Sequence, residues 1–247
     1  MSSDLAMDRV GDPSSLRMTA RIAGFLYLVV ILGGIFAQFF VRSRLIVPGD
    51  ATTTVNNIMA SERMFRIAFV ADLVAATCYF LVGVALYAVL KPVNKTIALL
   101  FVLMVSISTA IQCTNLLNHF AALLLVSGAD YLKVLGTAPL DALALFFLTM
   151  HKYGYLIAQI FFGGWLFPLG FLVYKSGYFP KVMGVLLIIA SLGYLIGSFV
   201  AFLLPGHEVI AYPGYVLAAV GEISFCVWLL IKGVKIQTRD TGAPGST

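Results

Sequence analysis

The sequence predicts an all-α protein, a polytopic helical bundle with six transmembrane helices and cytoplasmic N and C termini. Of the 247 residues, 61% are hydrophobic and 11% are charged, whereas soluble domains are about half apolar and about a quarter charged. Six apolar stretches are each long enough to cross about 30 Å of hydrocarbon. Basic residues gather in alternate connections between these stretches, which is typical of the cytoplasmic side of membrane proteins.

The first predicted span opens at Arg21 with "RIAGFLYLVVILGGIFAQFFV". The polar residues before it, 1–18, are expected to form a disordered cytoplasmic tail. Cleavage as a signal peptide is disfavoured, because Ile35 would occupy the −3 position before Ala37, where a small residue is required. We therefore expect this span to be retained.

Five further spans follow, separated by loops with proline, glycine and lysine. They cover residues 65–90, 96–125, 153–174, 182–204 and 211–231. A single transmembrane domain, residues 19–235, holds all six predicted spans. Residues 236–247, which end in "GAPGST", are expected to form a second disordered cytoplasmic tail.

Two segments are expected to extend the helices on the outer side. Residues 51–62 follow a possible helix cap at Asp50 and place Val55, Ile58 and Met59 on one stripe. The stretch "PLDALALFFLTM" precedes the fourth span in the same manner.

The basic loops set the expected orientation. Lys91 and Lys95 join spans two and three, and Lys175 and Lys181 join spans four and five. With six spans these loops share the side of both termini, which is therefore the cytoplasmic side. We expect a multi-pass protein of the cell membrane, in bacteria the inner membrane, with membrane lipids as partners. The net charge of +5 does not indicate nucleic-acid binding, because no basic tract with interleaved aromatic residues occurs.

Each predicted span places a polar side chain roughly 24–30 Å from its cytoplasmic end. Asp72, for example, lies 19 residues from Lys91, and Gln112 lies 17 residues from Lys95. Two interpretations stay open for this layer. It is either ordinary solvation at the outer interface or an organised outer-facing cavity, whose polar groups face the bundle interior because lipid cannot satisfy them.

The layer supplies most of the candidate ligand-binding residues. Asp72 is expected to be the charged wall of the cavity, with Arg66 as its partner, while Glu222 lies in the middle of the last span. A mid-membrane carboxylate is either protonated and bonded to a neighbouring helix or a site for a proton or cation. The candidates are Glu222, Asp72, Arg66, His151, Gln112, Asn115, Tyr155 and Gln159.

The sequence predicts no metal site and no cofactor. A haem or metal bridging His119 and His151 was considered, since imidazoles on facing helices ligate both, but interfacial histidines are commoner. No HExxH, GxSxG, GxxxxGK[ST] or strand-linked GxGxxG motif occurs. The cysteines, Cys78, Cys113 and Cys226, form no CxxC pair and are expected to pack in the bundle.

Several stretches together resemble an uncharacterised bacterial membrane family, domain-of-unknown-function family 4386. They are "ARIAGFLYL", "ERMFRIAFVADL", "LYAVLKPVN", "HKYGYLI", "YKSGYFPKVMGVLL" and "GEISFCVWLLIKGV". The family's signature would fall on Arg21, Glu62, Arg66, Asp72, His151, Gly177 and Glu222. His119 is not part of that pattern, which weakens the two-histidine interpretation. The resemblance implies a membrane protein and a bacterial source, and no chemistry.

Three functions remain open from the sequence. The leading hypothesis is a binding or transport protein for a small molecule, a proton or an ion, with an outer-facing polar cavity. The second is a membrane-embedded enzyme acting on a lipid or small amphiphile, which requires His151, Asp72 and Glu222 to converge within about 3–5 Å. The third is a structural subunit of a membrane complex.

Overall fold

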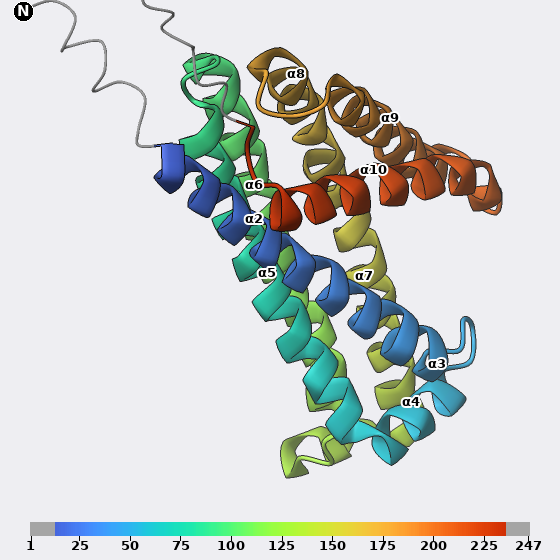
Figure 1. The fold of residues 1–247 in the computed structure, drawn as a ribbon. Helices are drawn as coiled ribbons and strands as arrows, with labels where there is room; N and C mark the ends of the chain where they lie inside the picture. The colour runs from blue at the N-terminus through green and yellow to red at the C-terminus, as the bar shows by residue number, and fades with distance from the viewer. Residues whose placement is uncertain (1–12, 236–247) are drawn as a thin grey trace, which may run out of the picture.

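The computed structural model describes residues 13–235, which are almost entirely helical and contain no strand (Figure 1). Six helical segments are long and apolar enough to cross a membrane, which confirms the predicted helical bundle. The elements are α2 Pro13–Ile35, η1 Phe36–Arg42, α3 Ser43–Leu45, α4 Ala51–Ala60, α5 Glu62–Leu90, α6 Lys95–Val126, η2 Asp130–Leu135, α7 Thr137–Gly164, α8 Leu166–Ser176, α9 Lys181–Leu203, η3 Glu208–Ala211 and α10 Tyr212–Ile231.

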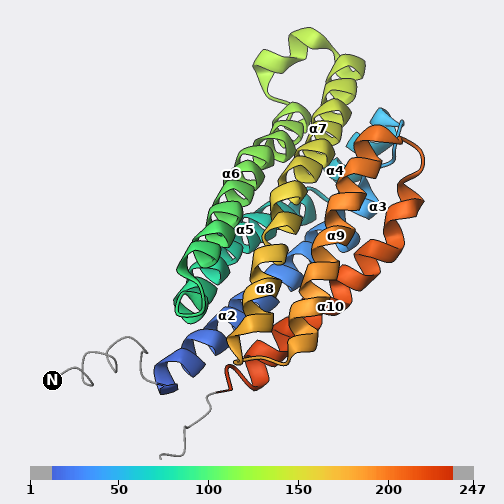
Figure 2. The same cartoon turned by 90° about the horizontal axis from the view of Figure 1, so that it is seen from above.

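The two ends of the described chain lie at the same end of the bundle, together with the α5–α6 and α8–α9 connections (Figures 1 and 2). We call this the proximal end. The α3–α4 segment and the α6–α7 connection lie at the opposite, distal end. The basic residues of the two short connections therefore share the proximal end with both ends of the described chain; they are Lys91, Lys95, Lys175 and Lys181.

The first helix begins earlier than the sequence predicts. We expected residues 1–18 to be a disordered tail, but α2 starts at Pro13, so residues 13–18 are helical. Proline is compatible with a first helical turn because its missing amide has no intrahelical partner there. Leu16 packs against the main core, which anchors this added turn. Residues 1–12 and the predicted tail at 236–247 lie outside the described residues.

The fourth span is longer than predicted and broken. The expected outer extension and the membrane span form one helix, α7, which stops at Gly164 and continues as α8 after Trp165. Trp165 is fully buried, and its ring packs against Tyr27, Tyr79 and Phe101. The outer helix expected at residues 51–62 is also present as α4, and the Asp50 side chain caps it by accepting from the Thr53 amide.

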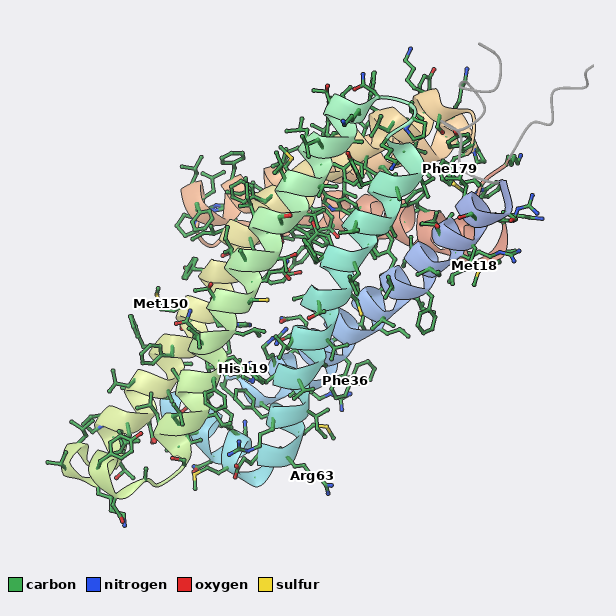
Figure 3. All side chains as sticks on the ribbon, turned by 90° about the vertical axis from the view of Figure 1, so that its left-hand side faces the viewer. Met18, Phe36, Arg63, His119, Met150 and Phe179 are labelled. Carbon is green, nitrogen blue, oxygen red and sulfur yellow. The ribbon has the colours of Figure 1, made fainter. Side chains whose placement is uncertain are left out.

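Two apolar clusters form the core. The larger surrounds Trp165 in the proximal half, and the smaller, which includes Ile58, Phe65 and Leu148, lies in the distal half. Between them is a layer of buried polar residues that includes His119, which lies well inside the distal tip marked by Arg63 (Figure 3). The buried side chains of this layer therefore lie in the bundle interior.

Candidate functional site

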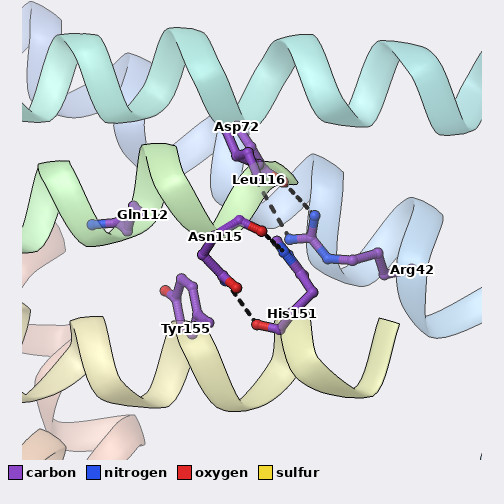
Figure 4. A pocket seen from close by; sticks show the side chains of 7 residues that line it. All are labelled: Arg42, Asp72, Gln112, Asn115, Leu116, His151 and Tyr155. Atoms are coloured by element: carbon purple, nitrogen blue, oxygen red, sulfur yellow. Dashed lines mark hydrogen bonds and ion pairs between the residues drawn. The ribbon is translucent and has the colours of Figure 1, made fainter. Parts of the chain in front are cut away.

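A small polar pocket lies within this layer, where η1, α5, α6 and α7 meet (Figure 4). Its free volume is about 30 Å³, enough for an ion or a water molecule or two. Organic ligands occupy pockets of about 300–1,000 Å³, so the pocket is an ion-sized site. The residues that line it are Arg42, Asp72, Gln112, Asn115, Leu116, His151 and Tyr155.

Arg42 enters the pocket from η1, a segment with π-helical winding. This winding adds a residue to each turn, and such segments are frequent at functional sites. The Arg42 side chain is buried, its Nε donates to Gln38 Oε1 at 2.9 Å, and its guanidinium forms an ion pair with Asp72. A second contact, from Nη2 to Asp72 Oδ1, is longer at 3.5 Å.

The prediction that Arg66 is the partner of Asp72 was wrong. Arg66 instead pairs with Glu62 one turn earlier on α5, and both side chains are about half exposed. Arg66 therefore lies outside the pocket. The sequence analysis expected the partner of Asp72 on the same helix, whereas its partner, Arg42, belongs to η1. The sequence offers little signal for Arg42, because a charge that directly follows an apolar run ordinarily lies at the membrane interface.

Asn115 and His151 clasp α6 to α7. Asn115 Nδ2 donates to the His151 carbonyl at 2.8 Å, and His151 Nδ1 lies 3.2 Å from the Asn115 carbonyl. Gly154 makes this close approach possible, because a Cβ there would lie 2.1 Å from Asn115 Oδ1. The clasp holds the imidazole of His151 in place beside the pocket.

His119, for which the sequence predicts no metal-binding role, lies against His151. Its ring is fully buried, stacks on Phe65 with 3.9 Å between ring centroids, and has Nε2 at 3.2 Å from the Phe65 carbonyl. The His119 and His151 rings meet edge to face with centroids 5.6 Å apart. Asp72, His119 and His151 each offer one ligand atom, and these atoms lie within 4.8 Å of one another.

Glu222 belongs to a second polar group, towards the proximal side. It lies halfway along α10, is buried, and accepts hydrogen bonds from the Tyr27 hydroxyl and from the Tyr194 hydroxyl, the latter at 2.6 Å. Glu222 does not line the pocket. The convergence of Asp72, His151 and Glu222 that an enzyme would need is therefore not observed.

Gln159 lies between the two groups. Its amide nitrogen is 3.1 Å from both the Ser198 and Tyr215 hydroxyls and 3.2 Å from the Tyr194 carbonyl. One turn before it on α7, Tyr155 lines the pocket. Of the sequence-predicted candidates, five line the pocket: Asp72, Gln112, Asn115, His151 and Tyr155.

The fold and the site define a polytopic helical membrane protein with a small polar pocket between its helices. Residues 22–233 match the family model described as "Domain of unknown function (DUF4386)", and the chain belongs to this family. It is also similar to an uncharacterized protein of Archaeoglobus fulgidus, with 38% identity over 156 residues, which are 63% of this chain and 77% of the relative. No solved structure matches the chain. Because this relative is archaeal, the likeness is not confined to bacteria.

Proposed function

We propose that the protein binds and transports a small cation, the proton included, by way of the Asp72 pocket and Glu222. One observation carries the proposal. Two carboxylates, the buried Glu222 and the partly buried Asp72, lie at different depths of an apolar bundle, and each is held in its own polar network. Buried ionisable groups in a membrane are costly, and they mark ion and proton pathways more often than they serve packing.

The size of the pocket favours a small cation over an organic molecule. A free volume of about 30 Å³ admits an ion or water. The Asp72 carboxylate, the amide oxygens of Gln112 and Asn115 and the His151 imidazole offer acceptor atoms there, beside the Arg42 guanidinium. Arg42 balances the charge of Asp72 while the pocket holds no cation.

A file of polar side chains on α7 runs from the pocket towards Glu222. His151, Tyr155 and Gln159 are spaced four residues apart and therefore share one face of the helix. Gln159 contacts the Tyr215 hydroxyl, the Tyr215 ring packs on Tyr194, and Tyr194 donates to Glu222. This sequence of groups supports a route for a proton or small cation between the two carboxylates.

Glu222 suits the role of proton or cation acceptor. Within residues 13–235 it forms no ion pair with lysine, arginine or histidine, and both of its oxygens accept from tyrosine hydroxyls. A buried carboxylate without a cationic partner is stabilised by binding a proton or a passing cation. We propose that the pocket faces the outside of the cell membrane, because the lysine-rich connections lie at the proximal end.

A membrane-embedded enzyme is the second candidate function. It is favoured by the convergence of Asp72, His119 and His151 within 4.8 Å, a set able to act as acid, base or metal ligands. In this case Glu222 would have no part in catalysis, because it lies in a separate network. Hydrolysis or modification of an added lipid that depends on His151 and not on Glu222 would favour the enzyme.

Flux into proteoliposomes tests the transport proposal. Purified protein is reconstituted, a membrane potential is imposed, and uptake of protons or of Na⁺, K⁺ or divalent cations is followed with trapped indicator dyes. We expect uptake above that of empty vesicles for the wild type and for Arg66→Gln, whose exposed ion pair lies outside the pocket. Asp72→Asn and Glu222→Gln should reduce uptake to the level of empty vesicles.

Two results would contradict transport. The wild type could show no uptake above empty vesicles for any of these cations, or both carboxylate variants could match the wild type. The second result, with all proteins equally well reconstituted, would favour a structural subunit whose buried carboxylates serve only packing.

A further inference from the structure

We propose that Asp72, His119 and His151 form a binding site for a divalent first-row transition metal ion. The inference rests on the proposed function, because it names the class of cation that the pocket region takes. It reverses the expectation from the sequence, where His119 and His151 were interpreted as interfacial residues and no metal site was predicted. The structure instead buries both rings and brings them to the Asp72 carboxylate.

The donor set and its spacing suit such an ion. Two imidazoles and one carboxylate are the protein ligands of many zinc and non-haem iron sites, with the remaining positions open. The three donor atoms lie within 4.8 Å of one another, whereas ligand atoms around a bound tetrahedral ion are about 3.3 Å apart. Binding therefore requires the side chains to close inward by small rotations. A haem does not fit, because the pocket has no room for a macrocycle.

The His119 ring presents a free lone pair inside the protein. Its Nε2 faces the Phe65 carbonyl, which only accepts, so Nε2 carries the hydrogen. The other nitrogen, Nδ1, is therefore an acceptor, and it has no hydrogen-bond partner within residues 13–235 although the ring is fully buried. Buried polar atoms without a partner are rare and call for a specific explanation, of which an ion is one.

His151 is arranged in the same way. Its Nδ1 donates to the Asn115 carbonyl, which leaves Nε2 with the lone pair. Histidines that bind metals nearly always donate their other ring nitrogen to a carbonyl or carboxylate, because this fixes the tautomer and the orientation of the ring. Both histidines therefore already make the second hydrogen bond that a metal site needs, each by donating to a backbone carbonyl on a helix.

Asp72 can serve as third ligand while still in contact with Arg42. The guanidinium is closest to Oδ2, and its contact with Oδ1 is long at 3.5 Å, so Oδ1 has room for a second partner. A divalent ion and Arg42 repel each other and compete for the same carboxylate. Replacing Arg42 with glutamine should therefore tighten metal binding, so that the site fills at a lower metal concentration.

Cobalt is the probe for the test, because Co²⁺ takes the same ligands as Zn²⁺ and absorbs visible light when bound in a low-symmetry site. The full-length protein is purified in mild detergent with an affinity tag that contains no histidine, and Co²⁺ is titrated in. We expect visible d–d bands that saturate at one Co²⁺ per chain and disappear when Zn²⁺ is added. Elemental analysis of the same samples measures the bound metal.

The variants give the matched comparison. His119→Gln and His151→Gln should lose the bands, and Arg42→Gln should reach saturation at lower Co²⁺. His207→Gln is the control, because the remaining histidine of the chain is exposed in the α9–η3 connection, away from the cluster. Size-exclusion profiles and thermal unfolding verify that each variant is folded, and His119→Asn replaces His119→Gln if the latter is not.

Absence of saturable Co²⁺ bands in the wild type would overturn the proposal, as would full binding by folded His119 and His151 variants. The outcome is separable from that of the transport proposal. Proton or monovalent-ion flux that depends on Asp72 and Glu222, in a protein that binds no Co²⁺, would leave transport standing and remove the metal site. Co²⁺ binding by a protein that shows no flux would support the metal site and contradict transport.

Discussion

Asp72 carries a charge within an apolar helix because Arg42 reaches it from a different segment of the chain. The Arg42 side chain is 8% exposed and that of Asp72 is 17% exposed, so water screens this pair little. The Arg66–Glu62 pair on the same helix α5 is about half exposed. The two pairs have the same chemistry and differ in burial, which makes them a matched comparison.

We predict that Asp72→Asn lowers the free energy of unfolding by about 3 kcal/mol, because Arg42 is left buried without its counter-ion. Arg66→Gln should cost about 0.5 kcal/mol or less, as exposed ion pairs do. The double variant Arg42→Gln with Asp72→Asn should recover part of the loss. Denaturant unfolding of the four proteins in one detergent measures these differences, and equal losses for Asp72→Asn and Arg66→Gln would refute the prediction.

For single residues, the sequence predicted five that line the pocket. Asp72, Gln112, Asn115 and Tyr155 were found from their similar depth, and His151 from its place on the same helical face as Tyr155. It missed Arg42, since counting along a regular helix cannot anticipate the π-helical winding of η1. It also set His119 aside, because nothing in the sequence shows that Phe65, on another helix, supplies the carbonyl that orients the ring.

Among the elements, α6 and α7 depend on close contact at Gly154. A Cβ at this position would lie 2.1 Å from Asn115 Oδ1, whereas a Cβ at Gly164, farther along α7, would meet Met104 Sδ at an ordinary 3.4 Å.

We predict that Gly154→Ala displaces Asn115, breaks its clasp with His151 and destabilises the protein by about 1–3 kcal/mol, as overpacking does. Gly164→Ala should be neutral or slightly stabilising, because alanine favours a helix over glycine. Thermal unfolding of both variants checks this. Equal melting temperatures would show that α6 and α7 can separate at Gly154 without loss.

The start of α4 gives a prediction on pH. Hydrogen bonds from the Thr53 hydroxyl and amide lower the pKa of Asp50, which lies outside the membrane-spanning segments. A lowered folded-state pKa means that the cap stabilises α4 above the unfolded pKa of the carboxyl and weakens as pH falls through the folded value. Hydrogen exchange of the α4 amides should therefore be faster in Asp50→Ala than in the wild type at neutral pH.

That difference should shrink in acid as the wild-type carboxyl is protonated. Asp50→Asn is the control, because an asparagine cap does not titrate in this range. A difference between Asp50→Ala and the wild type that stays constant with pH would argue against the charged cap.

Element by element, the apolar runs predicted most ends of the membrane helices to within a few residues, whereas α7 begins at Thr137 because the expected outer extension is continuous with the span. The exceptions have local causes. Leu16 packs against the core near the start of α2 at Pro13, a contact that hydropathy along one segment does not show. The break between α7 and α8 lies between Gly164 and Pro168, because proline has no amide hydrogen for the Gly164 carbonyl.

For the whole molecule, the sequence predicted the six-span architecture because hydrocarbon allows backbone groups to be satisfied only within helices or closed barrels. It left open whether the polar layer was an interface or a cavity. The apolar cluster that includes Ile58 of α4 and Phe65 of α5 favours an interior position for this layer. Such a cluster combines residues from segments far apart in the chain.

The most direct measurement is cation-dependent unfolding of the purified protein. Any cation that binds only the folded state stabilises it, by about 2.7 kcal/mol at a hundredfold excess over its Kd. Melting temperatures are recorded against concentrations of Na⁺, K⁺, Ca²⁺, Mn²⁺ and Zn²⁺ and against pH. We predict a saturable rise for at least one of these cations in the wild type and in Arg66→Gln, and none in Asp72→Asn. Melting temperatures that no cation raises, or a rise that persists unchanged in Asp72→Asn, would contradict a cation site at Asp72.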